Sequence, residues 1–590
     1  MKQWLVFLVA TLALLLVGCE VETAWSAHEE EFNRIRELLP QQYSTNLSLP
    51  ESSREDVFVV YSIDGVMVED NRLLYTNPDV DTTIELTLSI THANQVRQYT
   101  IDIIEVSEAN RDLNVVFDII FDTIDAKIPS RVTANLAVPQ VYSVDADIDY
   151  LIDCTDIVRN RIVYTFPDQN ETCSLTAIVT YDGVTRMQVF TVTMSGISSL
   201  PQIPTVYITT ENNDDIWSKD IYTKATMSVD YHGMYDGDAI TNAGIQIRLR
   251  GNSTMFMPKR PYKIKFDEKT AFFADYKEYD WTLLSNHADQ SLVRNASAFW
   301  MADQLGMAFV PNYTFVDVYI NDEYQGNYLV SDHVEVTNDR VDIEEHSANI
   351  DTGYLIEYDY KIFDYPEGTY NSFLVDNIPF SLKSPDWDED VYSNAQKTYI
   401  DNYMTNLLDT LQNQEDYSDL IDEASFIDWF IVNEIFKNVD VGYSSVYYYK
   451  DAGEKLKMGP VWDFDLSSGV PGYLHERGPT GWYTPNWNKN RFFHYLMQYP
   501  EFQSALKERW NEVKDTAIDG VLDQIFVFAD HMTYSRHKNF LLYSVIGNED
   551  EWWTAPEILA IDTYDGQLWF LYDYLETRIA WLDTEINNFD

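Results

Sequence analysis

The chain has 590 residues, of which 45 % are hydrophobic and 14 % aromatic, so it can bury several cores and is not globally disordered. Its 96 acidic and 40 basic residues give a formal net charge of −56 at pH 7. Such a polyanion repels nucleic acid and anionic membranes, which excludes both as partners bound through bulk electrostatics. The charge either keeps a secreted protein soluble or attracts divalent cations or a basic substrate.

The first residues have the pattern of an export signal. Lys2 is followed by the apolar run WLVFLVATLALLLVG at 4–18 and then by Cys19. A positive start before an apolar stretch too short to span a bilayer indicates a signal peptide over 1–18. Leu16-Val17-Gly18-Cys19 is similar to a bacterial lipobox, which implies lipidation of Cys19; an ordinary secretory signal is the alternative. We expect an exported lipoprotein that faces outward from a bacterial cell membrane.

The region 19–54 is expected to form a short helix or a tether, and EEEFNRIRELL (29–39) has helical spacing. From about Glu55 the hydrophobic period changes to two, as in strands. NRLLYTNPDVDTTIELTLSIT (71–91) lines up with NRIVYTFPDQNETCSLTAIVT (160–180), which reveals an internal repeat. The repeat predicts two tandem all-β, immunoglobulin-like sandwiches at 55–107 and 108–199, acting as spacers or as ligand-binding modules.

Two cysteines remain, Cys154 and Cys173. In an oxidising compartment a pair separated by a short loop can form a disulfide, although the sequence does not give their distance. Two cysteines without a nearby histidine cluster do not predict a metal site.

A linker at 201–204, PQIP, precedes a region in which the sequence pattern changes. Strand patterns such as IQIRLR and YKIKF alternate with turns up to about residue 385, with one helix expected near Leu292–Leu305. Residues 395–438 and 497–590 carry helical periodicity. The sequence therefore predicts a large α+β domain over 204–590 with a helical C-terminal part.

One stretch of this domain places carboxylates on both sides of a turn. VYYYK and KLKMGPV flank the turn residues DAGE, a pattern typical of an antiparallel hairpin. Asp440 precedes the hairpin and Asp463 follows it, so both are expected at its open end. Phosphoryl transfer needs such a pair, one carboxylate to orient a hydroxyl and one to hold Mg²⁺. Asp465 offers a second metal ligand, whereas acidic residues beside a hairpin also occur without function.

A basic segment lies upstream, at 245–266. A strand leads into the small-residue turn Gly251-Asn252-Ser253-Thr254, whose amides and hydroxyls can cradle phosphates. Cations around the turn can balance phosphate charge, and they are Arg250, Lys259, Lys263 and Lys265. The alternative is an exposed basic edge strand that prevents aggregation. Asp332 and Glu357 are candidate charge partners for a phosphate-binding lysine.

An ordered set of motifs over about 204–585 resembles the CotH kinase family, the spore coat protein H-like atypical protein kinases. The motifs are RGNST (250–254), DWTLLSNHADQSLVRN (280–295), YINDEYQGNYLVSDHVE (319–335), GYLIEYD (353–359), FKNVD (436–440) and GPVWDFDLSSG (459–469). The resemblance implies an atypical kinase fold that binds ATP with Mg²⁺ or Mn²⁺ and phosphorylates serine or threonine.

The resemblance also implies roles for individual residues. Asp440 matches the catalytic aspartate and Asp463 the metal-binding one. The nucleotide-side loop is matched by Arg250, Gly251 and Ser253, and the basic position by Lys259. The Asp…Arg-Asn segment is matched by Asp289, Arg294 and Asn295, in a structural or phosphate-facing role.

Two positions depart from the family pattern. Ser445 stands where many members have an asparagine that could ligate a second metal, and Asp332-His333 stands where Glu-Lys is common. Serine is the weaker metal ligand, and His333 can be neutral.

Three functions compete. The first is a surface-anchored Ser/Thr kinase that acts on an exported protein, and the second is a catalytically weak relative that serves in surface adhesion or assembly. The third, a metal-dependent hydrolase using Asp463 and Asp465, would need further ligands that His475 and His494 do not obviously supply.

Overall fold

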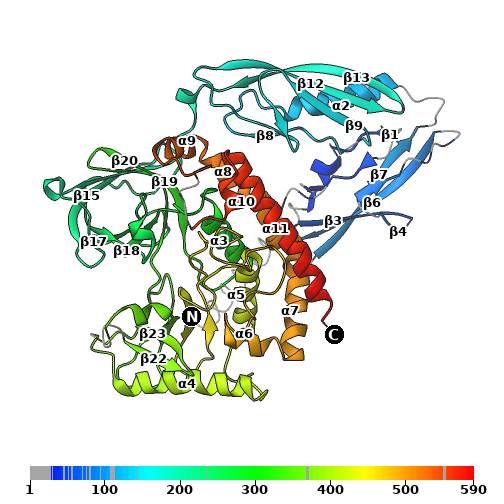
Figure 1. Ribbon diagram of the computed structural model, residues 1–590. Helices are drawn as coiled ribbons and strands as arrows, with labels where there is room; N and C mark the ends of the chain where they lie inside the picture. Colours follow the sequence, from blue (N-terminus) through cyan, green and yellow to red (C-terminus); the bar gives the residue numbers. More distant parts are fainter. Residues whose placement is uncertain are drawn as a thin grey trace, which may run out of the picture. The chain divides into compact units, whose positions relative to one another are not determined.

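The structure is a computed structural model, and it describes residues 28–29, 31–36, 38–43, 47–50, 52, 54, 57–64, 66–68, 71–74, 76, 78, 81–92, 95–106, 113–142, 144–235, 237–366, 371–387, 389–548 and 553–589. The chain divides into two compact units, Met1–Ser199 and Leu200–Asp590. Figure 1 labels the elements of each unit. The predicted signal peptide and the lipidation residue Cys19 lie outside the described residues.

The first unit is largely β, as predicted. Its elements are β1 (Gln42–Tyr43), β2 (Leu47–Ser48), β3 (Val57–Ile63), β4 (Val66–Met67), β5 (Arg72–Leu73), β6 (Thr82–His92), β7 (Gln95–Glu105), α2 (Leu113–Lys127), β8 (Leu136–Ala137), β9 (Asp147–Ile152), β10 (Ile157–Val158), β11 (Arg161–Ile162), β12 (Glu171–Tyr181) and β13 (Val184–Met194).

The internal repeat appears as two long antiparallel hairpins. The first, β6–β7, belongs to a sheet of order β1-β7-β6-β3-β4, and the second, β12–β13, to a sheet of order β13-β12-β9. Each repeat also has a small second sheet, β2-β5 in one and β10-β11-β8 in the other. A disulfide joins Cys154 to Cys173 of β12, with their Cα atoms 5.7 Å apart.

Each repeat carries a helical segment that the predicted sandwiches did not include. Residues 31–36 are helical, and Ile35 is fully buried in one hydrophobic core with Tyr61 and Leu86. This segment is therefore part of the folded unit and not a free tether. In the second repeat, α2 buries Phe117, which contacts the ring of Tyr181 edge-on.

The second unit begins with a closed seven-stranded barrel of order β14-β15-β16-β17-β18-β20-β19. Its strands are β14 (Thr205–Thr210), β15 (Thr223–Asp230), β16 (Ala243–Leu249), β17 (Tyr262–Thr270), β18 (Glu278–Leu284), β19 (Tyr313–Ile320) and β20 (Glu323–Asp332). Alternation fills the barrel: Ile245, Ile247 and Leu249 of β16 enter its core, so Arg248 lies on the outer face.

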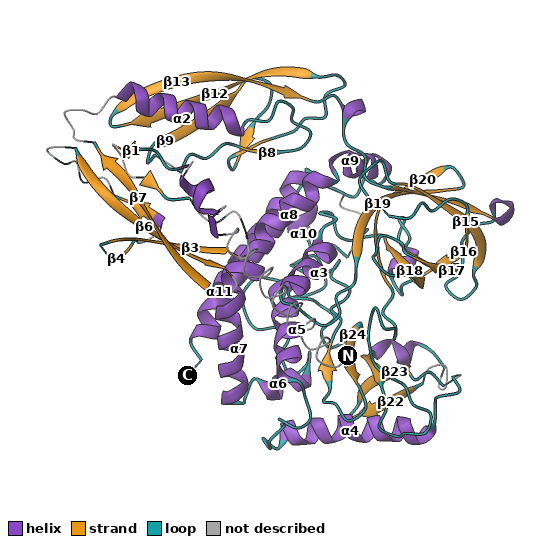
Figure 2. Cartoon of the chain, turned by 180° about the vertical axis from the view of Figure 1, so that it is seen from behind, coloured by secondary structure: helices purple, strands orange, loops and turns teal. Residues whose placement is uncertain are grey.

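A second sheet, of order β22-β23-β21-β24-β25, and a group of helices complete the unit (Figures 1 and 2). The remaining elements are α3 (Arg294–Gln304), β21 (Tyr354–Tyr358), the 3₁₀-helix η6 (Tyr360–Asp364), β22 (Ser372–Val375), β23 (Ile378–Ser384), α4 (Asn394–Gln412), α5 (Glu423–Phe436), β24 (Val446–Lys450), β25 (Lys457–Met458), α6 (Arg491–Leu496), α7 (Pro500–Val513), α8 (Asp519–His531), α9 (Thr533–Leu542), α10 (Pro556–Leu559) and α11 (Tyr564–Asn587).

One large hydrophobic core unites α3, the second sheet and the C-terminal helices. It includes Phe299 of α3, Ile356 of β21, Trp429 of α5 and Leu571 of α11. The predicted helix near Leu292–Leu305 is confirmed as α3, and the predicted helical C-terminal part is confirmed by α6 to α11. None of the described helices has the length and apolar character needed to cross a membrane.

Candidate active site

The predicted hairpin forms and brings its two acidic ends together. Helix α5 ends at Phe436, and β24 pairs antiparallel with β25 through Tyr448–Met458 and Tyr449–Lys457. Asn438 joins the two ends: its Oδ1 accepts from the Asp440 backbone N–H at 3.1 Å, and its Nδ2 donates to the Trp462 carbonyl at 3.3 Å. Asp440 and Asp463 therefore lie at the same end of the hairpin.

The carboxylates are close enough to perturb one another. Burial and the neighbouring Asp463 raise the pKa of Asp440 to about 7, against the opposing charges of Lys361 and Lys489. Burial also raises the pKa of Asp463, although Arg250 opposes the shift. For Asp465, burial followed by the charge of Asp463 holds the pKa well above its ordinary value. This crowding of negative charge favours the binding of a cation.

The backbone around the hairpin is held in an unusual conformation. Lys437, Ser445, Asp463 and Ser468 have φ values of 48°, 62°, 67° and 51°. Such left-handed conformations are uncommon for residues other than glycine and concentrate at functional sites. At Ser445 and Asp463 they set the directions of two side chains that contact each other.

Ser445 and Glu357 connect the hairpin to β21. The Ser445 hydroxyl donates to Asp463 Oδ2 at 3.2 Å, and its backbone N–H donates to Glu357 Oε1 at 2.9 Å. The other Glu357 oxygen pairs with Lys383 of β23 at 2.7 Å. Glu357 thus pairs with a lysine from outside the basic segment 245–266, and its role as partner of a phosphate-binding lysine stays a prediction.

Arg250 faces the acidic pair from the barrel. It follows β16, and its guanidinium lies 5.5 Å from the centre of the Trp462 ring. Asp463 and Asp465 both interact with it electrostatically. Among the described residues no carboxylate forms an ion pair with Arg250, so its donors can serve an added anion. The next residue, Gly251, has a φ of 83°, which favours glycine.

Lys263 lies on the same outer face of the barrel as Arg248, its cross-strand partner. Its Nζ pairs with Asp280 at 2.9 Å. Burial and the nearby cations Lys263 and Arg250 hold the pKa of His333 well below its ordinary value, so His333 is neutral. Lys265 is exposed on β17, beyond Lys263 and farther from the loop.

Lys259 does not join the group around Asp463. Its side chain is 1 % exposed, and its Nζ lies 5.1 Å from the centre of the Tyr328 ring and 6.0 Å from that of Tyr543. Burial lowers its pKa to about 7, and the carboxylates that oppose the shift are Asp317 and Asp289. The position of Lys259 therefore gives no support to a nucleotide-binding role.

The predicted pairing of Asp332 with a lysine is wrong. Its Oδ1 pairs with Arg340 at 3.0 Å, while its Oδ2 accepts from the Tyr276 hydroxyl at 2.6 Å and from the Asn312 backbone N–H at 2.7 Å. Asp332 is fully buried at the end of β20. The loop after β20 returns an arginine to this carboxylate, which satisfies it without a lysine.

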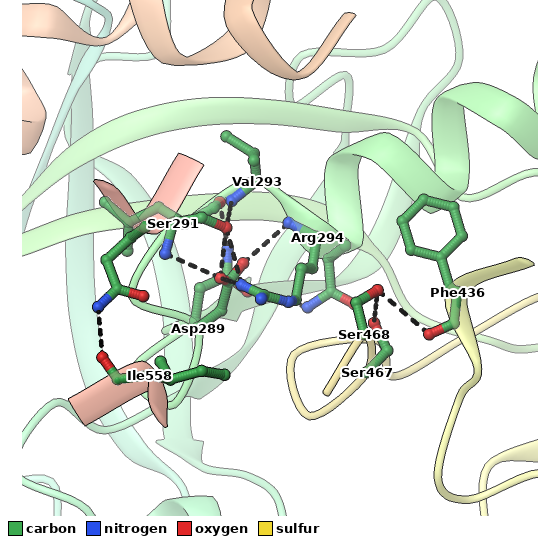
Figure 3. A network of polar contacts seen from close by, with 12 residues as sticks. Asp289, Ser291, Val293, Arg294, Phe436, Ser467, Ser468 and Ile558 are labelled. Atoms are coloured by element: carbon green, nitrogen blue, oxygen red, sulfur yellow. Dashed lines mark hydrogen bonds and ion pairs between the residues drawn. The ribbon is translucent and has the colours of Figure 1, made fainter. Parts of the chain in front are cut away.

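The Asp289, Arg294 and Asn295 segment is held by polar contacts, and Figure 3 shows those around Asp289 and Arg294. The Asp289 carboxylate pairs with the Arg294 side chain and accepts from the Arg294 backbone N–H at 2.8 Å. Asn295 Oδ1 accepts from the Phe464 backbone N–H at 2.7 Å. Because Phe464 lies between Asp463 and Asp465, this bond fixes the segment that carries both carboxylates. The alternative of a structural role, left open by the sequence, is the one this geometry favours.

The donor set fits Mg²⁺ or Mn²⁺. Mg²⁺ is commonly held by one or two carboxylates together with substrate phosphates and water, and Asp463, Asp465 and the Ser445 hydroxyl supply oxygen ligands. Among the described residues, three side chains of metal-ligating type come close together at Asp153, Cys154 and Cys173. The two cysteines form the disulfide and are therefore not thiolate ligands. A preformed all-protein metal cage, as the hydrolase hypothesis requires, is not seen at Asp463 among the described residues.

The sequence analysis missed three residues of the site: Asn438, Lys361 and Lys383. Asn438 and Lys361 lie within motifs quoted above or directly beside them, but nothing in their spacing distinguishes them from neighbouring polar residues. Lys361 reaches Asp440 only because η6 turns the chain directly after β21.

Comparison with known proteins decides the family. The family model described as CotH kinase protein matches residues 247–582, more than half of the chain. The chain belongs to the CotH kinase family. The matched region contains the barrel strands from β16 onward, the hairpin and all of Arg250, Asp440, Asp463 and Asp465. Membership indicates an atypical kinase-like protein for this part of the chain.

No curated protein matches this chain. Similar solved structures include the zebrafish RET cadherin-like domains 1 to 4, at 10 % identity over 41 % of this chain and 68 % of that chain, with a TM-score of 0.14. Drosophila N-cadherin EC1-4 matches at 10 % identity over 41 % of this chain and 72 % of that chain, with a TM-score of 0.11. Scores this low carry no argument about fold or function.

Proposed function

We propose that this protein transfers the γ-phosphate of ATP to a serine or threonine hydroxyl of an exported protein in a Mg²⁺-dependent reaction. The observation that carries the proposal is the arrangement of three groups. Asp440 and Asp463 meet at one end of the hairpin, and the Arg250 guanidinium faces Asp463 and forms no ion pair with a carboxylate of the described residues. Family membership supports the same reaction class.

In this proposal Asp440 orients the acceptor hydroxyl and takes its proton. The hydroxyl oxygen forms the new bond to phosphorus, the bond from phosphorus to the ADP oxygen breaks, and ADP leaves. Asp463 and Asp465, with the Ser445 hydroxyl, hold the metal. Bound Mg²⁺ supplies charge neutralisation at the phosphates. Arg250 and the backbone of the turn at Gly251 and Ser253 bind phosphate oxygens.

The cellular setting is part of the proposal. Lipidation of Cys19 would hold the protein at the outer face of a bacterial cell membrane, where its substrate is a co-exported protein. A net charge of −56 would attract a basic partner and repel nucleic acid. The unit Met1–Ser199 would serve as a spacer.

A catalytically weak protein with a surface assembly role is the second candidate. It is favoured by Ser445, which offers one hydroxyl where the family pattern has an amide. This hydroxyl already donates a hydrogen bond to Asp463. Such a protein would bind its partners without using ATP.

Nucleotide binding separates the two candidates. Calorimetric titration of ATP into the full chain, with and without Mg²⁺, should show tight binding only with the metal. Arg250→Ala and Asp463→Asn should each weaken binding at least tenfold, because each removes a charge-assisted contact worth about 1.5–3 kcal/mol. Lys265→Ala, an exposed cation of the neighbouring strand, is the control. Absence of binding by the folded parent chain would favour the assembly role.

A further inference from the structure

A cavity of about 490 Å³ in the second unit has Lys361, one of the lysines that act on Asp440, in its wall. Its walls come from the loop after β14, the β16–β17 loop and η6, and they include Trp217, Asn252, Phe256, Lys361 and Tyr365. Lys361 links the cavity to Asp440: its Nζ lies 4.9 Å from the centre of the Tyr443 ring, and the Tyr443 backbone N–H donates to the Asp440 carbonyl at 2.9 Å. The Lys361 charge also acts on the Asp440 carboxylate. The cavity therefore adjoins the position where an acceptor hydroxyl has to lie.

Aromatic side chains are exposed around this opening. Trp217 and Phe256, which line the cavity, are 66 % and 81 % exposed. Tyr443 and Tyr473, which are 41 % and 58 % exposed, lie on the Asp440 side: Tyr473 interacts electrostatically with Asp440 and Tyr443. Large exposed aromatic groups gathered at one opening mark a surface that another molecule covers.

Three of the four charged side chains that line the cavity, Lys219, Lys361 and Asp364, contact other groups of its wall, and the fourth is Asp220. Lys219 contacts the Tyr365 hydroxyl and lies 3.4 Å from Asn252 Oδ1. Lys361 and Asp364 are 3.8 Å apart. With these three charges engaged, Trp217, Met255 and Phe256 are the wall groups suited to contact an apolar side chain.

The Arg250 guanidinium, which is proposed to bind phosphate, is not part of the cavity wall. Arg250, at the start of the β16–β17 loop, faces Asp463, whereas Asn252 and Phe256 of the same loop face the cavity. Ser253, whose backbone belongs to the proposed phosphate-binding turn, also lines the cavity, so a nucleotide bound at Arg250 and Asp463 would share this edge of the loop and leave the wall formed by Trp217 and Phe256 free. An acceptor chain would approach Asp440 from this free side.

We propose that this cavity binds a bulky apolar side chain of the acceptor protein, aromatic or long aliphatic, close in sequence to the phosphorylated hydroxyl. The inference rests on the proposed kinase function and specifies its substrate class. Trp217 and Phe256 form the contacts that select this side chain. A basic acceptor segment with an aromatic residue near its serine fits both the cavity and the overall negative charge.

Docking can be measured without phosphoryl transfer. Peptides with one serine in a lysine-rich background, carrying phenylalanine, leucine or alanine at each neighbouring position, are titrated into the full Asp440→Asn chain. Tryptophan fluorescence reports binding. The best phenylalanine peptide should bind about tenfold more tightly than its alanine counterpart, the range expected for one buried apolar group. Trp217→Ala and Phe256→Ala should abolish this difference, and Leu541→Ala, which is 72 % exposed on α9, should keep it.

The same peptides are then offered to the parent chain with Mg²⁺ and ATP. Trp217→Ala should raise the KM for the phenylalanine peptide about tenfold and leave the KM for ATP unchanged. Equal binding of phenylalanine and alanine peptides, or a rise in the KM for ATP alone, would overturn the docking site; the second result would make the cavity part of the nucleotide site. Selective peptide binding without any ATP turnover would instead refute the kinase function and leave the docking site standing.

Discussion

Replacement of Asn295 tests whether the buried support behind the carboxylates is energetically important. Asn295 Oδ1 accepts from Phe464 N at 2.7 Å, and its Nδ2 donates to Asn286 Oδ1 at 2.9 Å. Phe464, Asn295 and Asn286 are at most 3 % exposed. Asn295→Ala leaves a buried N–H and a buried carbonyl oxygen without these partners, at a cost of about 2–4 kcal/mol in unfolding free energy. Urea denaturation of the full chain measures this loss.

The matched control lies on the same helix. Ser297 is fully buried, and among the described residues its hydroxyl has no hydrogen-bond partner. Ser297→Ala should therefore not lower the stability, because it removes a buried hydroxyl whose desolvation no hydrogen bond offsets. Asn295→Ala should also weaken Mg²⁺-dependent ATP binding, because Phe464 lies between Asp463 and Asp465. Equal urea midpoints for the two variants, with unchanged ATP binding, would refute this account of Asn295.

Three further predictions concern other parts of the chain. The pKa of Lys259 falls from 10.5 to about 7 on folding, so between these values the unfolded chain holds a proton that the folded chain lacks, and stability rises with pH. Lys259→Met should accordingly raise the free energy of unfolding by up to about 5 kcal/mol below pH 7, and this gain over the parent should disappear near pH 10. Urea midpoints of the variant and the parent that differ equally at all pH values would contradict this. Gly251→Ala should weaken ATP binding roughly tenfold, because an added Cβ is disfavoured at a φ of 83° and would lie against the Thr254 hydroxyl, so the loop has to move. If the loop does not bind ATP, calorimetry would show an unchanged affinity. Reduction of the Cys154–Cys173 disulfide, which spans 19 residues, should destabilise the first unit by about 3 kcal/mol and leave ATP binding intact, as calorimetric melting with and without reductant would show.

The hairpin was predictable because all of its information is local. A turn flanked by two strand patterns fixes the pairing, and the pairing alone brings Asp440 and Asp463 together. Helix α3 and the C-terminal helices were likewise predictable from their periodicity. The internal repeat correctly located the two long hairpins, since β6 and β12 fall at equivalent positions of the aligned segments.

The charge partners were not predictable, because they depend on how the barrel closes. The alternating pattern predicts that Lys263 lies on an outer face of the barrel. It does not show that Arg340 pairs with Asp332 at the end of β20, or that Lys259 enters a buried site between two tyrosines. The contact between Asn295 and the backbone of Phe464 spans 169 residues, and no local pattern encodes it.

The central claim is that Asp440 and Asp463 perform phosphoryl transfer. The most direct test incubates the full chain with γ-labelled ATP, Mg²⁺ or Mn²⁺ and a serine-containing basic acceptor, beside Asp440→Asn, Asp463→Asn and the exposed control Asp523→Asn. The parent and the control should label the acceptor or the chain itself, and the other two variants should lose about 100-fold or more of this labelling. Equal labelling by Asp440→Asn and the parent, or no labelling by the folded parent with either metal, would contradict it.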